Sequence, residues 1–281
     1  KFPYIAGKGG GGAFVLCYLI FLVILGLPVM TMEFAVGRSS QKSPVKAYQA
    51  LEKPGQKWHI HGYITVIGCY LLMMFYTTVS GWMLHYFYLT ATGKFAGLDA
   101  DQVGGVFTEM LSQPLVMAFW MIVVVAIGIF VCSRGLQNGL EKITKVMMLA
   151  LLAIMVVLAI NSVMMDGAAE GLKFYLVPDF GRMKELGIGY TIVTAMNQAF
   201  FTLSLGIGAM AIFGSYIGKE RSLLGESANI AILDTFVAIV SGLIIFPACF
   251  TFGVSPTSGP SLIFITLPNI FNHIPLGRLW G

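Results

Sequence analysis

Six long apolar runs dominate this sequence and limit the folds that it can adopt. Each approaches or exceeds the roughly 20 residues with which a helix crosses the hydrocarbon core of a bilayer. The chain is 57% hydrophobic and only 11% charged, whereas about a quarter of the residues in soluble domains are charged. We therefore expect an all-α polytopic membrane protein, with residues 1–281 forming a single transmembrane domain. Its expected spans are 12–37, 59–92, 115–132, 137–161, 188–217 and 226–254.

The basic residues predict how the spans are oriented. Loops on one side of the expected membrane contain ten: Arg38, Lys42, Lys46, Lys53, Lys57, Arg134, Lys142, Lys145, Lys219 and Arg221. The alternate loops, which include a long outer loop at 255–277, contain four: Lys94, Lys173, Arg182 and Lys184. The positive-inside rule places the first set in the cytoplasm. We expect a multi-pass protein of the inner (plasma) membrane whose net charge of +4 reflects topology and indicates no nucleic-acid partner.

The run at 188–217 contains weak helix formers at its centre. The stretch Thr202-Leu203-Ser204-Leu205-Gly206-Ile207-Gly208 lies where a membrane helix is normally regular. Irregular backbone at membrane depth is tolerated only where it is buried in protein or lines a cavity, and its free carbonyl groups can then bind a cation. The alternative is that the glycines only allow helices to pack closely. The residue pattern alone does not decide between the two.

Two acidic residues lie well inside the expected spans. Glu33 is near the cytoplasmic end of the first full span, and we expect it to be interfacial and paired with a basic group. Asp234 lies about 12 Å into its span at 1.5 Å per residue, and the other spans contain no lysine or arginine that could neutralise it. A carboxylate at this depth favours a bound monovalent cation. The alternatives are a protonated carboxyl group and a hydrogen bond from a neighbouring hydroxyl.

No set of residues in the sequence indicates a catalytic site. The chain has no serine–histidine–aspartate or cysteine–histidine arrangement, so we expect neither an enzyme nor an organic cofactor. His59-Ile60-His61 could bind a metal ion, but its position beside a basic loop favours an interfacial pair.

Several motifs together resemble the neurotransmitter:sodium symporter family. They are Lys1-Phe2-Pro3-Tyr4, Gly10-Gly11-Gly12-Ala13-Phe14, Gly26-Leu27-Pro28, Glu33 before Gly37-Arg38, Leu172 to Leu176, Phe200 to Gly206, and Phe264 to Asn269. The resemblance covers essentially the whole chain, from the second half of the family's helix 1 to the loop before helix 8. It implies part of a LeuT-type inverted-repeat fold, in which helices 1 and 6 are discontinuous.

The resemblance also implies the substrate-binding residues. Tyr76 matches the tyrosine that binds the substrate carboxylate, and Phe201 matches the aromatic lid over the substrate. The backbone of Phe201, Thr202 and Ser204 matches the cradle for the substrate amine. Leu72 and Ile207 match side-chain pocket positions, and both are apolar, so a neutral and hydrophobic amino acid is expected. For these two residues the alternative is ordinary packing or contact with lipid.

Ion and gate residues are implied in the same way. Thr202 and Asp234 match ligands of the first sodium site. Tyr18 and Gln198 match residues that surround chloride in chloride-dependent relatives, which have a neutral asparagine at the position of Asp234. Lys1 matches an outer-gate residue and Tyr216 an inner-gate residue.

The expected function is therefore sodium-coupled symport of a neutral amino acid by alternating access, independent of chloride because Asp234 supplies the negative charge. The alternative is a truncated binding or scaffold protein of the same fold that does not transport, since the first half of helix 1 and everything from helix 8 onward are missing. One departure concerns the fifth helix. Some relatives have a proline ten residues after Gly139, where this chain has Leu149.

Overall fold

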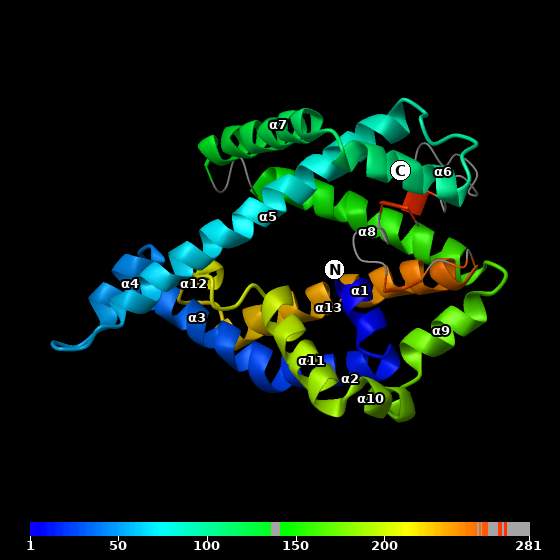
Figure 1. Ribbon diagram of the computed structural model, residues 1–281. Helices are drawn as coiled ribbons and strands as arrows, with labels where there is room; N and C mark the ends of the chain where they lie inside the picture. The colour runs from blue at the N-terminus through cyan, green and yellow to red at the C-terminus, as the bar shows by residue number, and fades with distance from the viewer. Residues whose placement is uncertain (136–140, 252, 254, 258–263, 266, 269–281) are drawn as a thin grey trace. The chain divides into compact units, whose positions relative to one another are not determined.

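The computed structural model describes residues 1–135, 141–251, 253, 255–257, 264–265 and 267–268. All regular structure within this part of the chain is helical, which confirms the predicted all-α class (Figure 1). In chain order the helices are α1 (Phe2–Lys8), α2 (Gly12–Phe21), the π-helical turn η1 (Leu22–Gly26), α3 (Leu27–Ser40), α4 (Pro44–Leu51), α5 (His59–Ala91), α6 (Ala100–Leu111), α7 (Pro114–Ser133), α8 (Lys142–Val163), α9 (Ala168–Leu176), α10 (Phe180–Leu186), α11 (Ile188–Thr202), α12 (Ala209–Gly214) and α13 (Leu223–Thr251).

Five of the described helices are long and apolar enough to cross a membrane. They are Gly12–Ser40, which joins α2, η1 and α3, together with His59–Ala91, Pro114–Ser133, Lys142–Val163 and Leu223–Thr251. The predicted span 188–217 is different, because it consists of two shorter helices, α11 and α12, on either side of an interruption. The predicted loop 255–277 and the first residues of the predicted span 137–161 fall largely outside the described residues.

Contacts within the chain define two compact units. The first contains residues 1–8, 74–175 and the described part of 239–281, and the second contains residues 9–73 and 176–238. Three of the boundaries fall inside helices, α5, α9 and α13, so each of these helices contributes to both units.

The first unit has an aromatic core beside α6. Asp99 caps this helix, because its side chain accepts a hydrogen bond from the Gln102 N–H while the Gln102 side chain accepts one from the Asp99 N–H. This reciprocal arrangement satisfies two backbone donors that a helix start leaves open. Helix α6 thereby presents its apolar face to a cluster made of Tyr86, Phe95, Val103, Phe107, Met110 and Phe264.

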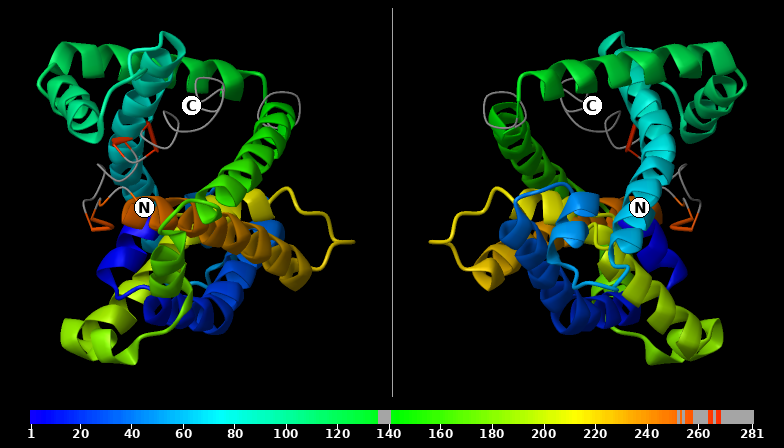
Figure 2. Two further views of the ribbon diagram at one scale, coloured as in Figure 1. Left: turned by 90° about the vertical axis from the view of Figure 1, so that its right-hand side faces the viewer. Right: turned by 90° about the vertical axis from the view of Figure 1, so that its left-hand side faces the viewer.

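In the second unit α12 packs closely against α3 (Figures 1 and 2). Two glycines permit this approach. A Cβ atom at Gly37 would collide with the Ala211 carbonyl group, and one at Gly214 would lie 2.6 Å from the Phe34 carbonyl oxygen. Because both obstacles are backbone atoms, neither can move aside without displacing a helix. Small residues at such crossings allow membrane helices to approach closely.

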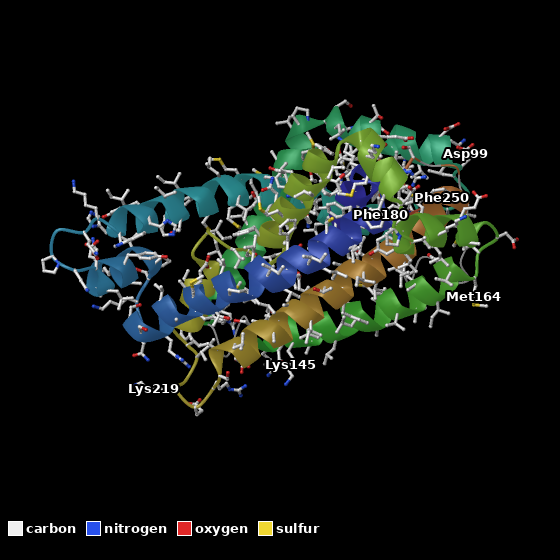
Figure 3. All side chains as sticks on the ribbon, turned by 90° about the horizontal axis from the view of Figure 1, so that it is seen from below. Asp99, Lys145, Met164, Phe180, Lys219 and Phe250 are labelled. Carbon is white, nitrogen blue, oxygen red and sulfur yellow. The ribbon has the colours of Figure 1, made fainter. Side chains whose placement is uncertain are left out.

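Side chains of α3 also hold the segment that joins α12 to α13, where Figure 3 labels Lys219. Arg38 Nη1 donates to the Arg221 carbonyl oxygen at 2.8 Å, and Thr31 Oγ1 donates to Ser227 Oγ at 3.0 Å. These bonds connect residues nearly two hundred positions apart in the sequence. They place the start of α13 next to the long N-terminal helix.

Helix α8 runs without interruption through Leu149. A proline at this position would remove one backbone hydrogen bond and clash with the preceding turn. Leucine does neither, so the regular helix agrees with the sequence.

The environments of Gly37 and Gly128 predict opposite effects of a substitution by alanine. We expect Gly37→Ala to lower stability by about 1–3 kcal/mol, because the new methyl group overpacks a backbone contact. Gly128 on α7 has no atom within 4 Å of an added Cβ, so Gly128→Ala is expected to raise stability by about 0.4–1 kcal/mol. Thermal unfolding of both full-length variants in one detergent measures the difference, and equal shifts would contradict the proposed contact.

Candidate functional site

The helix break occurs where the sequence predicted it. Helix α11 ends at Thr202 and α12 begins at Ala209. Between them φ is positive at every second residue: 53° at Ser204, 82° at Gly206 and 73° at Gly208. Glycine adopts this conformation without strain, but a serine there is uncommon and strained by roughly 1–3 kcal/mol. The discontinuous sixth helix of the predicted fold is therefore confirmed.

The break leaves a run of backbone carbonyl groups open. The Ser204 N–H donates to the Phe201 carbonyl oxygen at 3.1 Å, and regular helical bonding resumes when Ile212 donates to Gly208. Among the described residues, the carbonyl groups from Thr202 to Ile207 accept no backbone hydrogen bond. Carbonyl oxygens freed at membrane depth need another partner, such as a cation, water or a substrate donor.

Two leucines anchor the interrupted segment in the second unit. Leu203 is 2% exposed and Leu205 is 8% exposed. Gly26, the last residue of η1, makes room for the first of them, because a Cβ atom there would lie 2.7 Å from Leu203 Cδ1. The sequence analysis used Gly26 only as part of a family motif and did not anticipate η1, since no residue pattern distinguishes a single π-helical turn from an α-helix.

Glu33 contacts the break directly, which corrects the expectation that it pairs with a basic group. Its Oε1 accepts a hydrogen bond from the Gly206 N–H at 2.7 Å. Its Oε2 is buried and has no hydrogen-bond partner among the described residues. The Gly206 N–H is thus satisfied by a side chain of α3 in place of the helical carbonyl that it lost.

A polar cluster surrounds the end of α11. Gln198 Nε2 donates to Thr202 Oγ1 at 2.9 Å. The side chains of Thr202, Thr235 and Asp234 all lie near the Tyr18 hydroxyl group. The structure therefore brings Tyr18, Gln198, Thr202 and Asp234 together in one unit. Thr235, which follows Asp234, was not singled out from the sequence.

The Asp234 carboxylate is incompletely paired within the described chain. Its Oδ2 is buried without a hydrogen-bond partner, and no described lysine, arginine or histidine forms an ion pair with it. A buried carboxylate costs several kcal/mol unless a positive charge or hydrogen-bond donors compensate it. Asp234 and Thr202 both lie near the Tyr18 hydroxyl group, and oxygen atoms of these types are the ligands that hard cations prefer.

The other predicted site residues are distributed over both units. Ile207 lies near Gly68, with 3.9 Å between its Cγ2 atom and an added Cβ, and Leu72 is one turn further along α5. Phe201 is half-buried, whereas Tyr216 is 67% exposed. Lys1, which is exposed, and Tyr76, which is 42% exposed, belong to the first unit.

The two histidines of the possible metal motif have separate partners. His59 Nδ1 lies 2.8 Å from Glu52 Oε1, whereas the His61 ring packs edge-on against Tyr48 with 5.0 Å between ring centroids. The described residues include no group of three or more histidine, cysteine, aspartate or glutamate side chains that could hold a metal ion.

Comparison with known proteins identifies the family. The sequence model of the sodium:neurotransmitter symporter family matches residues 1–103 and 107–281. The chain belongs to this family. It is 39% identical over 280 residues to YhdH of Bacillus subtilis, described as an uncharacterised sodium-dependent transporter. The match covers all of this chain and 61% of the relative. It is 25% identical to the sodium-dependent serotonin transporter of Drosophila melanogaster, covering all of this chain and 51% of that protein.

The solved structure of MhsT in complex with L-phenylalanine supports the same fold. Its TM-score to this chain is 0.93 at 38% sequence identity, and the match covers 99% of this chain and 62% of the solved one. The predicted LeuT-type architecture is therefore confirmed for the described part of this symporter-family chain. The chain spans about three fifths of the length of these bacterial relatives. The names of these relatives describe transporters and not enzymes.

The Glu33–Gly206 hydrogen bond predicts a difference between two substitutions. Glu33→Leu removes the acceptor, so we expect the backbone amides of 203–208 to exchange with deuterium faster. Glu33→Gln keeps an acceptor oxygen of similar reach and should retain most of the protection. Hydrogen–deuterium exchange of the full-length protein, followed by mass spectrometry, compares the two. Equal exchange in both variants would show that this bond does not hold the break.

Proposed function

We propose that the protein to which this chain belongs couples the inward movement of sodium to the uptake of a neutral amino acid across the plasma membrane. The observation that carries the proposal is the open backbone at Thr202–Ile207 beside the incompletely paired carboxylate of Asp234. Open carbonyl groups can receive an ammonium group, and a carboxylate can receive a cation. Family membership supports the proposal.

Sodium is proposed to bind to Thr202 and Asp234. Both residues supply oxygen atoms, which a hard monovalent cation prefers to nitrogen or sulfur. Gln198 donates its side-chain hydrogen bond to Thr202 Oγ1, so the lone pairs of that hydroxyl oxygen are held in a defined direction. Ligands that are already ordered lose less conformational entropy when they bind an ion.

We further propose that transport does not require chloride. A sodium ion and a carboxylate about 4 Å apart attract each other by roughly 4 kcal/mol at an effective dielectric constant of about 20. Asp234 can therefore supply, as part of the chain, the negative charge for which some relatives need a bound anion. The proposal is supported by the proximity of Asp234 to the Tyr18 hydroxyl group, because Tyr18 matches a residue of the family's chloride site.

The proposed substrate is a small neutral amino acid with an apolar side chain. Leu72 and Ile207 would contact its side chain, and the open backbone beside Phe201, Thr202 and Ser204 would receive its amino group. On family resemblance, Tyr76 would bind the carboxylate. The complex of MhsT with L-phenylalanine is consistent with an apolar amino acid.

Alternating access would use residues on both sides of this site. Tyr216 lies two residues after the end of α12 and is proposed to close the inner side. Lys1 is proposed to take part in an outer charge pair. A lysine provides a single point charge, without the forked geometry with which arginine holds a carboxylate.

Substitution of Thr202 tests the sodium assignment. We expect Thr202→Val to raise the sodium concentration for half-maximal amino acid binding about tenfold, because loss of one neutral oxygen ligand costs about 1–1.5 kcal/mol. Thr191→Val is the matched control: it also removes a buried hydroxyl group from α11, but one that donates to the Gly9 carbonyl oxygen. Binding of radiolabelled amino acid to the full-length protein measures both. Equal sodium dependence in the two variants would reject the assignment.

Chloride replacement tests the role of Asp234. In proteoliposomes with gluconate in place of chloride, we expect sodium-driven uptake to persist, because the carboxylate remains. Asp234→Asn removes the charge and should make any remaining uptake depend on chloride. If chloride removal abolished uptake by the unmodified protein, Asp234 would not supply the required charge. Absence of any saturable sodium dependence would favour a protein that does not transport.

A further inference from the structure

A basic segment joins the first described span, which ends with α3 at Ser40, to α5. We define it as residues 42–58, which contain the lysines Lys42, Lys46, Lys53 and Lys57 and one acidic residue, Glu52. All four lysines are exposed. In Figure 1 the part between α4 and α5 forms a loop that projects from the ends of these two helices.

The only acidic side chain of the basic segment, Glu52, is already bonded to His59, the first residue of α5. Glu52 Oε2 accepts a hydrogen bond from the His59 N–H at 3.0 Å, and Oε1 lies 2.8 Å from His59 Nδ1. Desolvation opposes the charge of Glu52, but the hydrogen bonds from His59 outweigh it and hold the pKa of the carboxyl group below its ordinary value. Glu52 therefore stays ionised, and its oxygen atoms face His59. The four lysines have no ion-pair partner among the described residues.

Apolar side chains accompany these charges. Trp58 is 59% exposed and Leu51 is 46% exposed. Trp58 directly precedes α5, whose first turns continue the exposed apolar surface with Ile60 and Ile64. Tryptophan is enriched where membrane spans meet the headgroup region, and lysines near a span favour the negatively charged surface of the cytoplasmic leaflet.

We propose that the basic segment is a docking surface for anionic phospholipid headgroups of the cytoplasmic leaflet. The lysine ammonium groups attract the lipid phosphates, and Trp58 and Leu51 contact the upper part of the acyl chains. Charge complementarity and the adjoining apolar residues select a lipid, since a soluble phosphate would use only the lysines.

The surface is held in shape by its own backbone and by its neighbours. The Lys53 N–H donates to Gln56 Oε1 at 3.1 Å, and the Gln56 N–H donates to the Lys53 carbonyl oxygen at 3.0 Å. At the start of α4, Pro44 packs against Gly208, where an added Cβ would lie 2.9 Å from Pro44 Cγ. The basic segment thus includes a helix, α4, whose first residue contacts Gly208 at the C-terminal end of the helix break.

Fluorescence quenching of Trp58 tests the proposal in the full-length protein. The protein is placed in phosphatidylcholine vesicles that contain a minor fraction of a brominated lipid. This lipid is either phosphatidylglycerol or phosphatidylcholine, and in both cases the bromine atoms lie near the headgroup end of the acyl chains. The signal lost in Trp58→Phe defines the contribution of Trp58. We expect brominated phosphatidylglycerol to quench it more strongly than brominated phosphatidylcholine, and added salt to reduce the difference because it screens the charges.

A variant with glutamine at all four lysines should lower the phosphatidylglycerol preference at least about five-fold, since each basic residue near the surface contributes on that order. The control replaces Lys94, Lys173 and Lys184, which lie in the expected outer loops, by glutamine and should retain the preference. A second variant, with only Lys53 and Lys57 replaced, should show an intermediate loss. Equal quenching by the two lipids, or a preference that survives in the four-lysine variant, would overturn the proposal.

Discussion

The structure of the second unit depends on one constraint: backbone groups that leave helical geometry inside an apolar region must find other partners. Between Thr202 and Ala209 some of these backbone groups have a partner and others do not. The Gly206 N–H donates a hydrogen bond to the Glu33 carboxylate. The carbonyl groups from Thr202 to Ile207, by contrast, accept no hydrogen bond from a backbone N–H among the described residues. An unsatisfied polar group in such surroundings costs several kcal/mol. These oxygens therefore need another partner, and sodium and the substrate amine are the partners that we propose.

The packing around the break fixes its conformation from several directions. Leu203 occupies the space that Gly26 leaves open in η1, and Gly208 lies against Pro44 at the start of α4. Further along, the glycine crossing at Gly37 holds α12 on α3. Because these contacts involve backbone atoms or residues without a side chain, the segment has few alternative arrangements. A rigid surround of this kind can maintain the strained φ angle of Ser204.

Much of this arrangement followed from the sequence. Apolar run length predicted the helical membrane class. The weak helix formers marked where a break could lie, and the family resemblance, not the pattern alone, predicted a discontinuous helix there. The partner of Glu33 was predicted wrongly, because it is a backbone N–H that is distant in sequence and has no residue-type signature. The η1 turn and Thr235 were not anticipated for a similar reason: both depend on how helices pack in three dimensions. Asp234 could be recognised because a lone acid in an apolar span is conspicuous without any structure.

The direct measurement is the position of a bound cation. Crystals of the full-length protein grown with thallium in place of sodium would reveal the ion by its anomalous scattering. The account predicts an anomalous peak in contact with both Thr202 Oγ1 and the Asp234 carboxylate. A structure with thallium bound elsewhere, and with Asp234 paired only with a donor of the protein, would contradict it.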